Sequence, residues 1–137
     1  MKGSVSMRSR PLSPHLGVFK WIHTMVSSIL HRITGIAQTV GVLLLAYWLM
    51  ALASGPDAYA RAAALLGSVP GRILMAGFLL AFVYHLCSGI RHLTWDAGYG
   101  LEKSEARKSF VLVLVATGVI FAALAMLVFF TPGRGAS

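Results

Sequence analysis

Residues 33–53, ITGIAQTVGVLLLAYWLMALA, decide the fold of this chain, because they form a long apolar stretch without a charged side chain. As an α-helix the stretch is about 31 Å long at about 1.5 Å per residue, which matches the hydrocarbon core of a bilayer. Arg32 precedes the stretch, and the next charge is Asp57. The pattern predicts a transmembrane helix over residues 28–53.

A second uncharged stretch occupies residues 73–90, between Arg72 and Arg91. Its helix is about 27 Å long, slightly less than the bilayer core, so the two flanking arginines are expected to extend outward to the membrane surface. The pattern predicts a second transmembrane helix over residues 73–95.

A third uncharged stretch, residues 109–133, predicts a transmembrane helix over residues 108–131. Turn-forming residues separate the first two spans, with SGPD at 54–57 and GSVPG at 67–71. The alanine-rich residues between these turns are suited to a short surface helix. We therefore expect an all-α integral membrane protein in which residues 1–137 form a single membrane domain.

The composition supports this prediction. Hydrophobic residues make up 57% of the chain and charged residues 12%, with a mean hydropathy of +0.75, against roughly 45–50% and about 25% in soluble domains. A soluble core of this size cannot bury so much apolar surface, which excludes a soluble enzyme domain. Cys87 is the only cysteine, which excludes an internal disulfide and a CxxC metal or redox motif.

The net charge of +8 comes from basic residues that flank the apolar stretches, so it indicates membrane edges rather than a surface for nucleic acid. Their distribution predicts an N-terminus on the cytoplasmic or matrix side and a C-terminus on the periplasmic or intermembrane side. Residues 1–27 are expected to be cytoplasmic and interfacial, with a short interfacial helix within residues 14–26. Nine lysines and arginines lie on the first side and three on the second: Lys2, Arg8, Arg10, Lys20, Arg32, Arg91, Lys103, Arg107 and Lys108 against Arg61, Arg72 and Arg134.

A first cluster of chemically useful side chains lies at the start of the first span. Ser28 and Arg32 are four residues apart and share a helix face, and His31 lies beside them. A hydroxyl and a guanidinium in this arrangement can donate hydrogen bonds to a carbonyl or a carboxylate. The structural alternative is that Arg32 only anchors the helix at the membrane surface and that His31 is an interfacial residue.

A second cluster lies at the end of the second span, at the same depth. His85 is six residues inside Arg91, about 9 Å along the helix axis, so it lies within the hydrocarbon. A neutral imidazole is a common ligand of haem iron, and Gly89 one turn away leaves room for a flat macrocycle. His92 shares the face of His85 and is a candidate for supporting a cofactor there. The alternatives are a His85 hydrogen-bonded to a neighbouring helix and an interfacial His92.

Neither cluster contains a nucleophile with a base, and no glycine-rich phosphate loop precedes a helix, so hydrolases and nucleotide-binding proteins are not indicated. Three motifs, RPLSPHL at 10–16, SILHRITG at 28–35 and HLCSGIRHLTWD at 85–96, resemble the cytochrome b membrane-anchor subunits of succinate dehydrogenase, respiratory complex II. Their order and spacing around three spans cover nearly the whole chain.

The resemblance implies a non-catalytic subunit of a complex in the inner (cytoplasmic) membrane. A second small anchor subunit would share one haem b with this chain, beneath a flavoprotein and an iron–sulfur subunit. Succinate oxidation, FAD and the iron–sulfur clusters would belong to those partners. His85 matches an axial ligand of the haem iron, with the other ligand on the partner anchor.

The resemblance also assigns a quinone site. Ser28 and Arg32 match residues of the ubiquinone site, with apolar lining at Ile29 and Leu16, and His31 and Arg32 match residues near the haem propionates. Two alternatives stay open at this point. One is the anchor of a fumarate reductase that works with menaquinone, and the other is a small structural or transport membrane protein without redox function.

Overall fold

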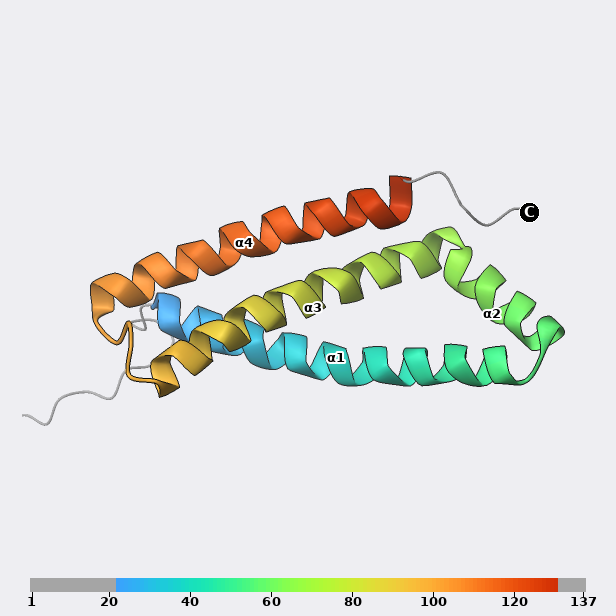
Figure 1. Cartoon of the computed structure of the whole chain (residues 1–137), viewed down its shortest axis with the longest axis horizontal. Coiled ribbons are helices and arrows are strands. Elements are labelled where there is room, and N and C mark those ends of the chain that lie inside the picture. The colour runs from blue at the N-terminus through green and yellow to red at the C-terminus, as the bar shows by residue number, and fades with distance from the viewer. Residues whose placement is uncertain (1–21, 131–137) are drawn as a thin grey trace, which may run out of the picture.

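The computed structural model describes residues 22–130, which are almost entirely helical (Figure 1). Three long helices and one short helix follow each other along the chain: α1 (His23–Ala53), α2 (Pro56–Gly67), α3 (Val69–Asp96) and α4 (Lys103–Phe130). By length and composition α1, α3 and α4 are each able to cross a membrane. The prediction of an all-α protein with three candidate spans is confirmed, and α2 is the short helix expected between the first two.

The separate N-terminal interfacial helix is absent from the described part of the chain. Residues 14–21, which make up most of that prediction, lie outside the described residues. Ile22 is extended, with φ −93° and ψ 142°, and His23 begins α1 directly. Residues 23–26, the last of the predicted interfacial helix, therefore form the first turn of α1. Polar residues can extend the backbone hydrogen bonding of a helix beyond its apolar part.

Two short turns connect α1 to α2 and α2 to α3. Gly55 has φ +108°, a conformation that favours glycine, and Pro56 then starts α2 with its restricted φ. Ser68 caps α3 by accepting a hydrogen bond from the Gly71 N–H at 3.2 Å. A side chain at Gly71 would clash with the carbonyl oxygens of Leu65 and Leu66, so this corner depends on glycine.

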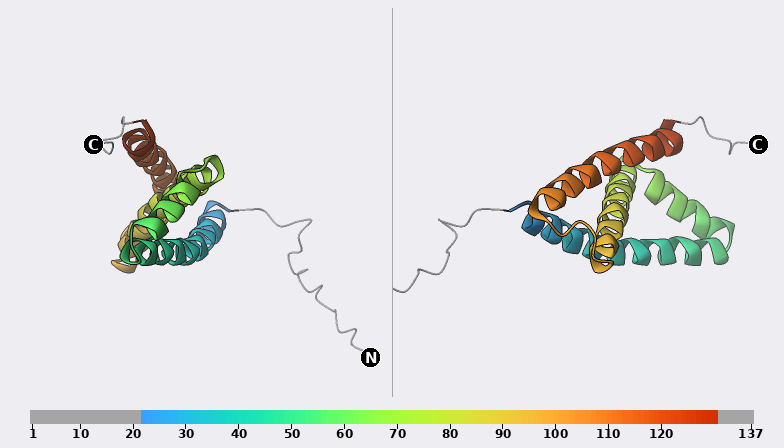
Figure 2. Two further views of the ribbon diagram at one scale, coloured as in Figure 1. Left: turned by 90° about the vertical axis from the view of Figure 1, so that its right-hand side faces the viewer. Right: turned by 60° about the vertical axis from the view of Figure 1, so that its left-hand side comes forward.

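The helix α3 lies between α1 and α4 and packs against both (Figure 1). The start of α1, the end of α3 and the start of α4 come together at one end of the bundle, which we call the polar end. The opposite end holds α2, the end of α1 and the start of α3, and we call it the α2 end. The helices α1 and α4 approach each other at the polar end and diverge toward the α2 end (Figure 2).

The buried core is small, and many large apolar side chains are exposed. Ile36, Leu43 and Met126, for example, are 69%, 66% and 64% exposed. In a bilayer such side chains face lipid tails that are as apolar as they are, so exposure has no hydrophobic cost. Among the residues that the structure describes, the buried apolar ones are Ala51, Ala62, Val83, Tyr84, Ala106, Phe110 and Val113.

Candidate functional site

Three histidines from two helices meet at the polar end. The ring of His31 on α1 stacks on the ring of His85 on α3, with centroids 4.0 Å apart and planes 11° apart. His92, two turns further along α3, meets the other side of the cluster with its ring edge-on to His31 at 4.8 Å. The structure thus brings together the three histidines that the sequence singled out on separate spans.

The imidazole of His85 is held by the backbone of α1. Its Nδ1 atom lies 3.2 Å from the carbonyl oxygen of His31 and 3.2 Å from the Thr34 hydroxyl oxygen. A carbonyl oxygen only accepts hydrogen bonds, so the contact with His31 requires the proton on Nδ1. The lone pair of the neutral ring is then on Nε2, the tautomer in which a histidine binds iron through that atom.

Thr34 fits this arrangement because its own proton is used elsewhere. The Thr34 hydroxyl donates to the Leu30 carbonyl oxygen at 2.8 Å and is 3.0 Å from that of His31. Its oxygen can therefore accept from the Nδ1–H of His85. The hydroxyl and the carbonyl together fix both the tautomer and the tilt of the His85 ring.

Two glycines leave space for the stacked rings. A Cβ atom at Gly35 would lie 3.2 Å from Cε1 of His85, and one at Gly89 would lie 4.0 Å from Cε1 of His31. Gly89 therefore faces the histidine cluster, with the ring of His31 as its neighbour. The rings are thus packed between α1 and α3, tightly at Gly35 and with ordinary van der Waals spacing at Gly89.

The histidine cluster fits a haem iron that takes one axial ligand from this chain. His85 offers an oriented Nε2, and the Nδ1 atom of His31 is buried without a hydrogen-bond partner. An orphaned buried nitrogen beside His85 is a feature that a bound polar group would satisfy. Within residues 22–130, no group of three or more His, Cys, Asp or Glu side chains is placed to hold a metal ion by itself.

The residues predicted for the quinone lie on a different face of α1. Ser28 is partly exposed, Ile29 is 39% exposed and Arg32 is exposed. Ser27, one residue earlier, is 1% exposed and faces the bundle. Ser28 and Arg32 thus lie on an outward surface that another chain is free to cover, while Leu16 lies outside the described residues.

Arg91 is buried, which the sequence did not predict. It was expected to extend outward to the membrane surface, but it is 4% exposed and turns into the bundle. Its guanidinium donates to the hydroxyls of Ser27 and Ser109 and to the carbonyl oxygen of Ala106. The only sequence signal for this contact was the presence of Ser27 and Ser109 near the ends of apolar stretches. Arg72, the other flanking arginine, is exposed as predicted.

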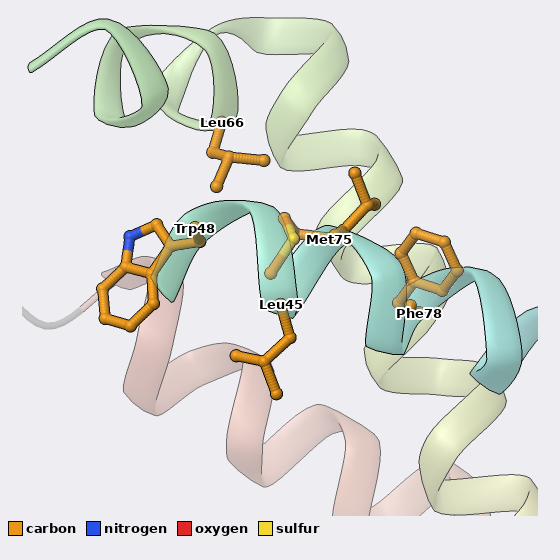
Figure 3. A pocket seen from close by; sticks show the side chains of 7 residues that line it. Leu45, Trp48, Leu66, Met75 and Phe78 are labelled. Atoms are coloured by element: carbon orange, nitrogen blue, oxygen red, sulfur yellow. The ribbon is translucent and has the colours of Figure 1, made fainter. Parts of the chain in front are cut away.

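The α2 end contains an apolar groove of about 300 Å³ between α1, α2 and α3 (Figure 3). Leu45 and Trp48 come from α1, Leu66 from α2, and Met75 and Phe78 from α3. None of these side chains is titratable, so the groove offers shape and apolar contact but no group for acid–base chemistry or metal binding.

Residues 6–125 match the protein family described as succinate dehydrogenase/fumarate reductase transmembrane subunit. The succinate dehydrogenase cytochrome b556 subunit of Paracoccus denitrificans is 44% identical over 126 residues, which cover 92% of this chain and 96% of that relative. The human mitochondrial succinate dehydrogenase cytochrome b560 subunit is 41% identical over 111 residues, covering 80% of this chain and 66% of that relative. The cytochrome b556 subunit of Rickettsia felis is 43% identical over 93 residues, covering 68% and 72%.

Proposed function

Because the chain belongs to the family of succinate dehydrogenase/fumarate reductase transmembrane subunits, we propose that it is the cytochrome b anchor subunit of a succinate dehydrogenase. In this role it holds haem b together with a second small anchor subunit and forms part of the site that reduces ubiquinone. The observation that carries the proposal is the oriented imidazole of His85, packed between two helices. A purely structural histidine would also hydrogen-bond across helices, and membership of this family supports the interpretation as a haem ligand.

The haem would take His85 Nε2 as one axial ligand. When bound, the haem would supply a one-electron carrier. The chain's own contribution is to keep the Nδ1 proton of His85 on the His31 carbonyl, which holds the lone pair of Nε2 ready. A dithionite-reduced spectrum of the purified complex tests this: b-type absorbance is expected, and its absence would remove the haem from the proposal.

The quinone would dock on the outward face of α1. Ser28 and Arg32 are positioned to donate hydrogen bonds to a quinone carbonyl, whose oxygen gains negative charge during reduction. Ile29, and Leu16 from the undescribed segment, would supply apolar walls. Donors that are already oriented in a site shielded from water stabilise this charge most strongly.

Two substitutions test the quinone site in the assembled complex. Arg32→Lys and Ser28→Ala are each expected to depress succinate:ubiquinone reductase activity, because lysine lacks the planar fork of arginine and alanine lacks the hydroxyl. Succinate oxidation with an artificial acceptor that takes electrons upstream of the quinone should persist. An arginine that only anchors the helix predicts a silent Arg32→Lys, and wild-type quinone reduction in both variants would refute the site.

The remaining partners follow from the same assignment. A flavoprotein subunit would carry FAD and oxidise succinate, and an iron–sulfur subunit would pass the electrons to the polar end.

The polar end would therefore face the cytoplasm or matrix, as the lysine and arginine distribution predicts. A reporter fused after Ser137 is expected to be active on the opposite side, in the periplasm or intermembrane space. Activity only in the cytoplasm would overturn this orientation.

A further inference from the structure

We infer that Arg91 is a positioning residue for the quinone site: its buried guanidinium locks the start of α1 to α3 and α4 and so fixes the helix face that carries Ser28 and Arg32. The inference rests on the proposed function of that face. It concerns a residue that touches neither the proposed haem ligand nor the proposed quinone donors.

The guanidinium of Arg91 connects three helices with three directed hydrogen bonds. From α3, its Nη1 donates to the Ser27 hydroxyl of α1 at 2.7 Å. Its Nη2 donates to the Ala106 carbonyl oxygen of α4 at 2.9 Å, and its Nε donates to the Ser109 hydroxyl of α4 at 2.9 Å. A planar fork with donors on three nitrogens fits this set of acceptors, and a lysine ammonium at the same place does not.

The surroundings of Arg91 are neutral. No salt bridge to a carboxylate is formed among the described residues, and the charge is instead solvated by two hydroxyls, one carbonyl and the face of Trp95, whose ring centroid is 4.0 Å from the guanidinium carbon. A buried cation in a membrane-spanning bundle is energetically costly, so its burial points to a specific role. Each of its three nitrogens already donates one hydrogen bond within the bundle, which favours positioning over the binding of a ligand.

The contact with Ser27 leads directly to the quinone face. Ser27 is the residue before Ser28 on the same helix, and its carbonyl also accepts a hydrogen bond from the Tyr84 hydroxyl at 3.4 Å. Two residues of α3, Arg91 and Tyr84, thus hold one residue of α1 by its side chain and its backbone. Because a helix turns as a rigid unit, a rotation of Ser27 out of this grip also moves Ser28 and Arg32.

A second route leads to the histidine cluster. Trp95, which lies against Arg91, donates from its indole N–H to the Gly100 carbonyl oxygen at 3.0 Å. Its ring meets His92 edge-on at 5.4 Å, and His92 in turn meets His31 at 4.8 Å. The guanidinium is therefore linked to the histidine cluster through Trp95 and His92, and to the helix face of Ser28 and Arg32 through Ser27.

The test uses four variants of the purified complex: Arg91→Lys, Arg91→Gln, Ser27→Ala and the control Arg107→Gln. Arg107 is exposed at the start of α4, so its variant removes a positive charge from the same end without touching the network. For Arg91→Lys we expect the KM for a short-chain ubiquinone to rise by about tenfold. A change of this size lies within the range of interaction energies between residues in contact. Ser27→Ala should give a smaller rise, and Arg107→Gln none. The rate with an artificial acceptor upstream of the quinone should stay unchanged in all four.

The double variant Arg91→Lys with Ser27→Ala separates positioning from general stability. If Arg91 acts through Ser27, the double variant has nearly the same quinone KM as Arg91→Lys alone, whereas independent effects multiply. Multiplicative effects, or variants that lower thermal stability with an unchanged quinone KM, would overturn the inference. If Arg91→Gln does not assemble, Arg91→Lys and Ser27→Ala still decide the question. A silent Arg32→Ala would instead refute the quinone site itself, so the two failures are distinguishable.

Discussion

The two ends of the bundle share α1 and α3 but are held together differently. At the polar end, side chains of α3 make directed hydrogen bonds to α1 and α4, through Tyr84, His85 and Arg91. At the α2 end, the described side-chain hydrogen bonds stay within one helix or its cap, such as those of Ser54 and Ser68. There the helices α1, α2 and α3 surround an apolar groove.

This contrast has a physical reason. Lipid tails are as apolar as leucine, so apolar contacts alone give helices in a bilayer little preference for one register. Directed polar contacts do specify register, and the short turns around α2 hold the other end by covalent connection. The polar end, where directed hydrogen bonds fix the register of the helices, is also the end where the histidines and the proposed quinone donors lie.

The two ends are expected to differ most in their response to the loss of one aromatic ring, His85 at the polar end and Phe78 at the α2 end. His85→Ala should abolish or strongly weaken the b-type absorbance of the purified complex, because it removes the proposed iron ligand. Phe78→Ala at the α2 end should leave the spectrum intact and lower the stability by roughly 1–3 kcal/mol, since Phe78 is only half-buried. Reduced-minus-oxidised spectra and thermal unfolding measure the two effects. An unchanged spectrum in His85→Ala would transfer the ligand assignment to another residue, with His92 next.

A smaller difference is expected for two glycines on α1. A methyl group at Gly35 would lie 3.2 Å from Cε1 of His85, and one at Gly41 would lie 3.3 Å from Cδ1 of Phe78. Gly35→Ala should shift the haem absorbance and midpoint potential, because the ring it displaces is the proposed ligand. Gly41→Ala should change only stability, by about 1 kcal/mol, because Phe78 can yield.

The matched control for these glycines is Gly77→Ala on α3, where no atom lies within 4 Å of the added methyl. It should leave the spectrum unchanged and raise the stability by about 0.5–1 kcal/mol, because alanine is the better helix former and the methyl group meets no neighbour. Equal spectral shifts from Gly35→Ala and Gly41→Ala would contradict the division of the bundle into two unlike ends.

The smallest effect is expected at the cap of α3. Ser68→Ala removes the acceptor of the Gly71 N–H and should lower the stability by about 1 kcal/mol. Quinone reduction and the haem spectrum should remain at wild-type values, since the cap lies at the α2 end. Ser54→Ala, at the exposed end of α1, serves as the comparison and should cost less. Loss of quinone activity in Ser68→Ala would show that the two ends are coupled more tightly than their contacts indicate.

The sequence predicted the three long helices because uncharged stretches of bilayer length have a direct physical meaning. It did not predict where the helices begin, since polar residues such as Lys103 and His23 continue the same backbone hydrogen bonding beyond the membrane core. The similar depth of His31 and His85 followed from counting along two spans. Their stacking did not, because it depends on how α1 and α3 are rotated about their axes.

Arg91 shows most clearly what the sequence could not give. Its position beside an apolar stretch is the same as that of Arg72, yet one side chain is buried and the other exposed. The acceptors that draw Arg91 inward come from two other helices, and one of them is the backbone carbonyl of Ala106. A carbonyl oxygen has no signature in a sequence, so only the packed bundle identifies this contact.

The hydrogen bonds that join Arg91 of α3 to α1 and α4 also have a consequence for the biogenesis of the protein. Synthesis proceeds from the N-terminus, so α1 and α3 reach the membrane before α4. Until α4 arrives, Ser27 is the only one of the three acceptors available to the guanidinium, so two of its three hydrogen bonds within the bundle are not yet formed. The last helix to be inserted therefore completes the environment of a charge placed earlier, which makes α4 the step that closes the polar end.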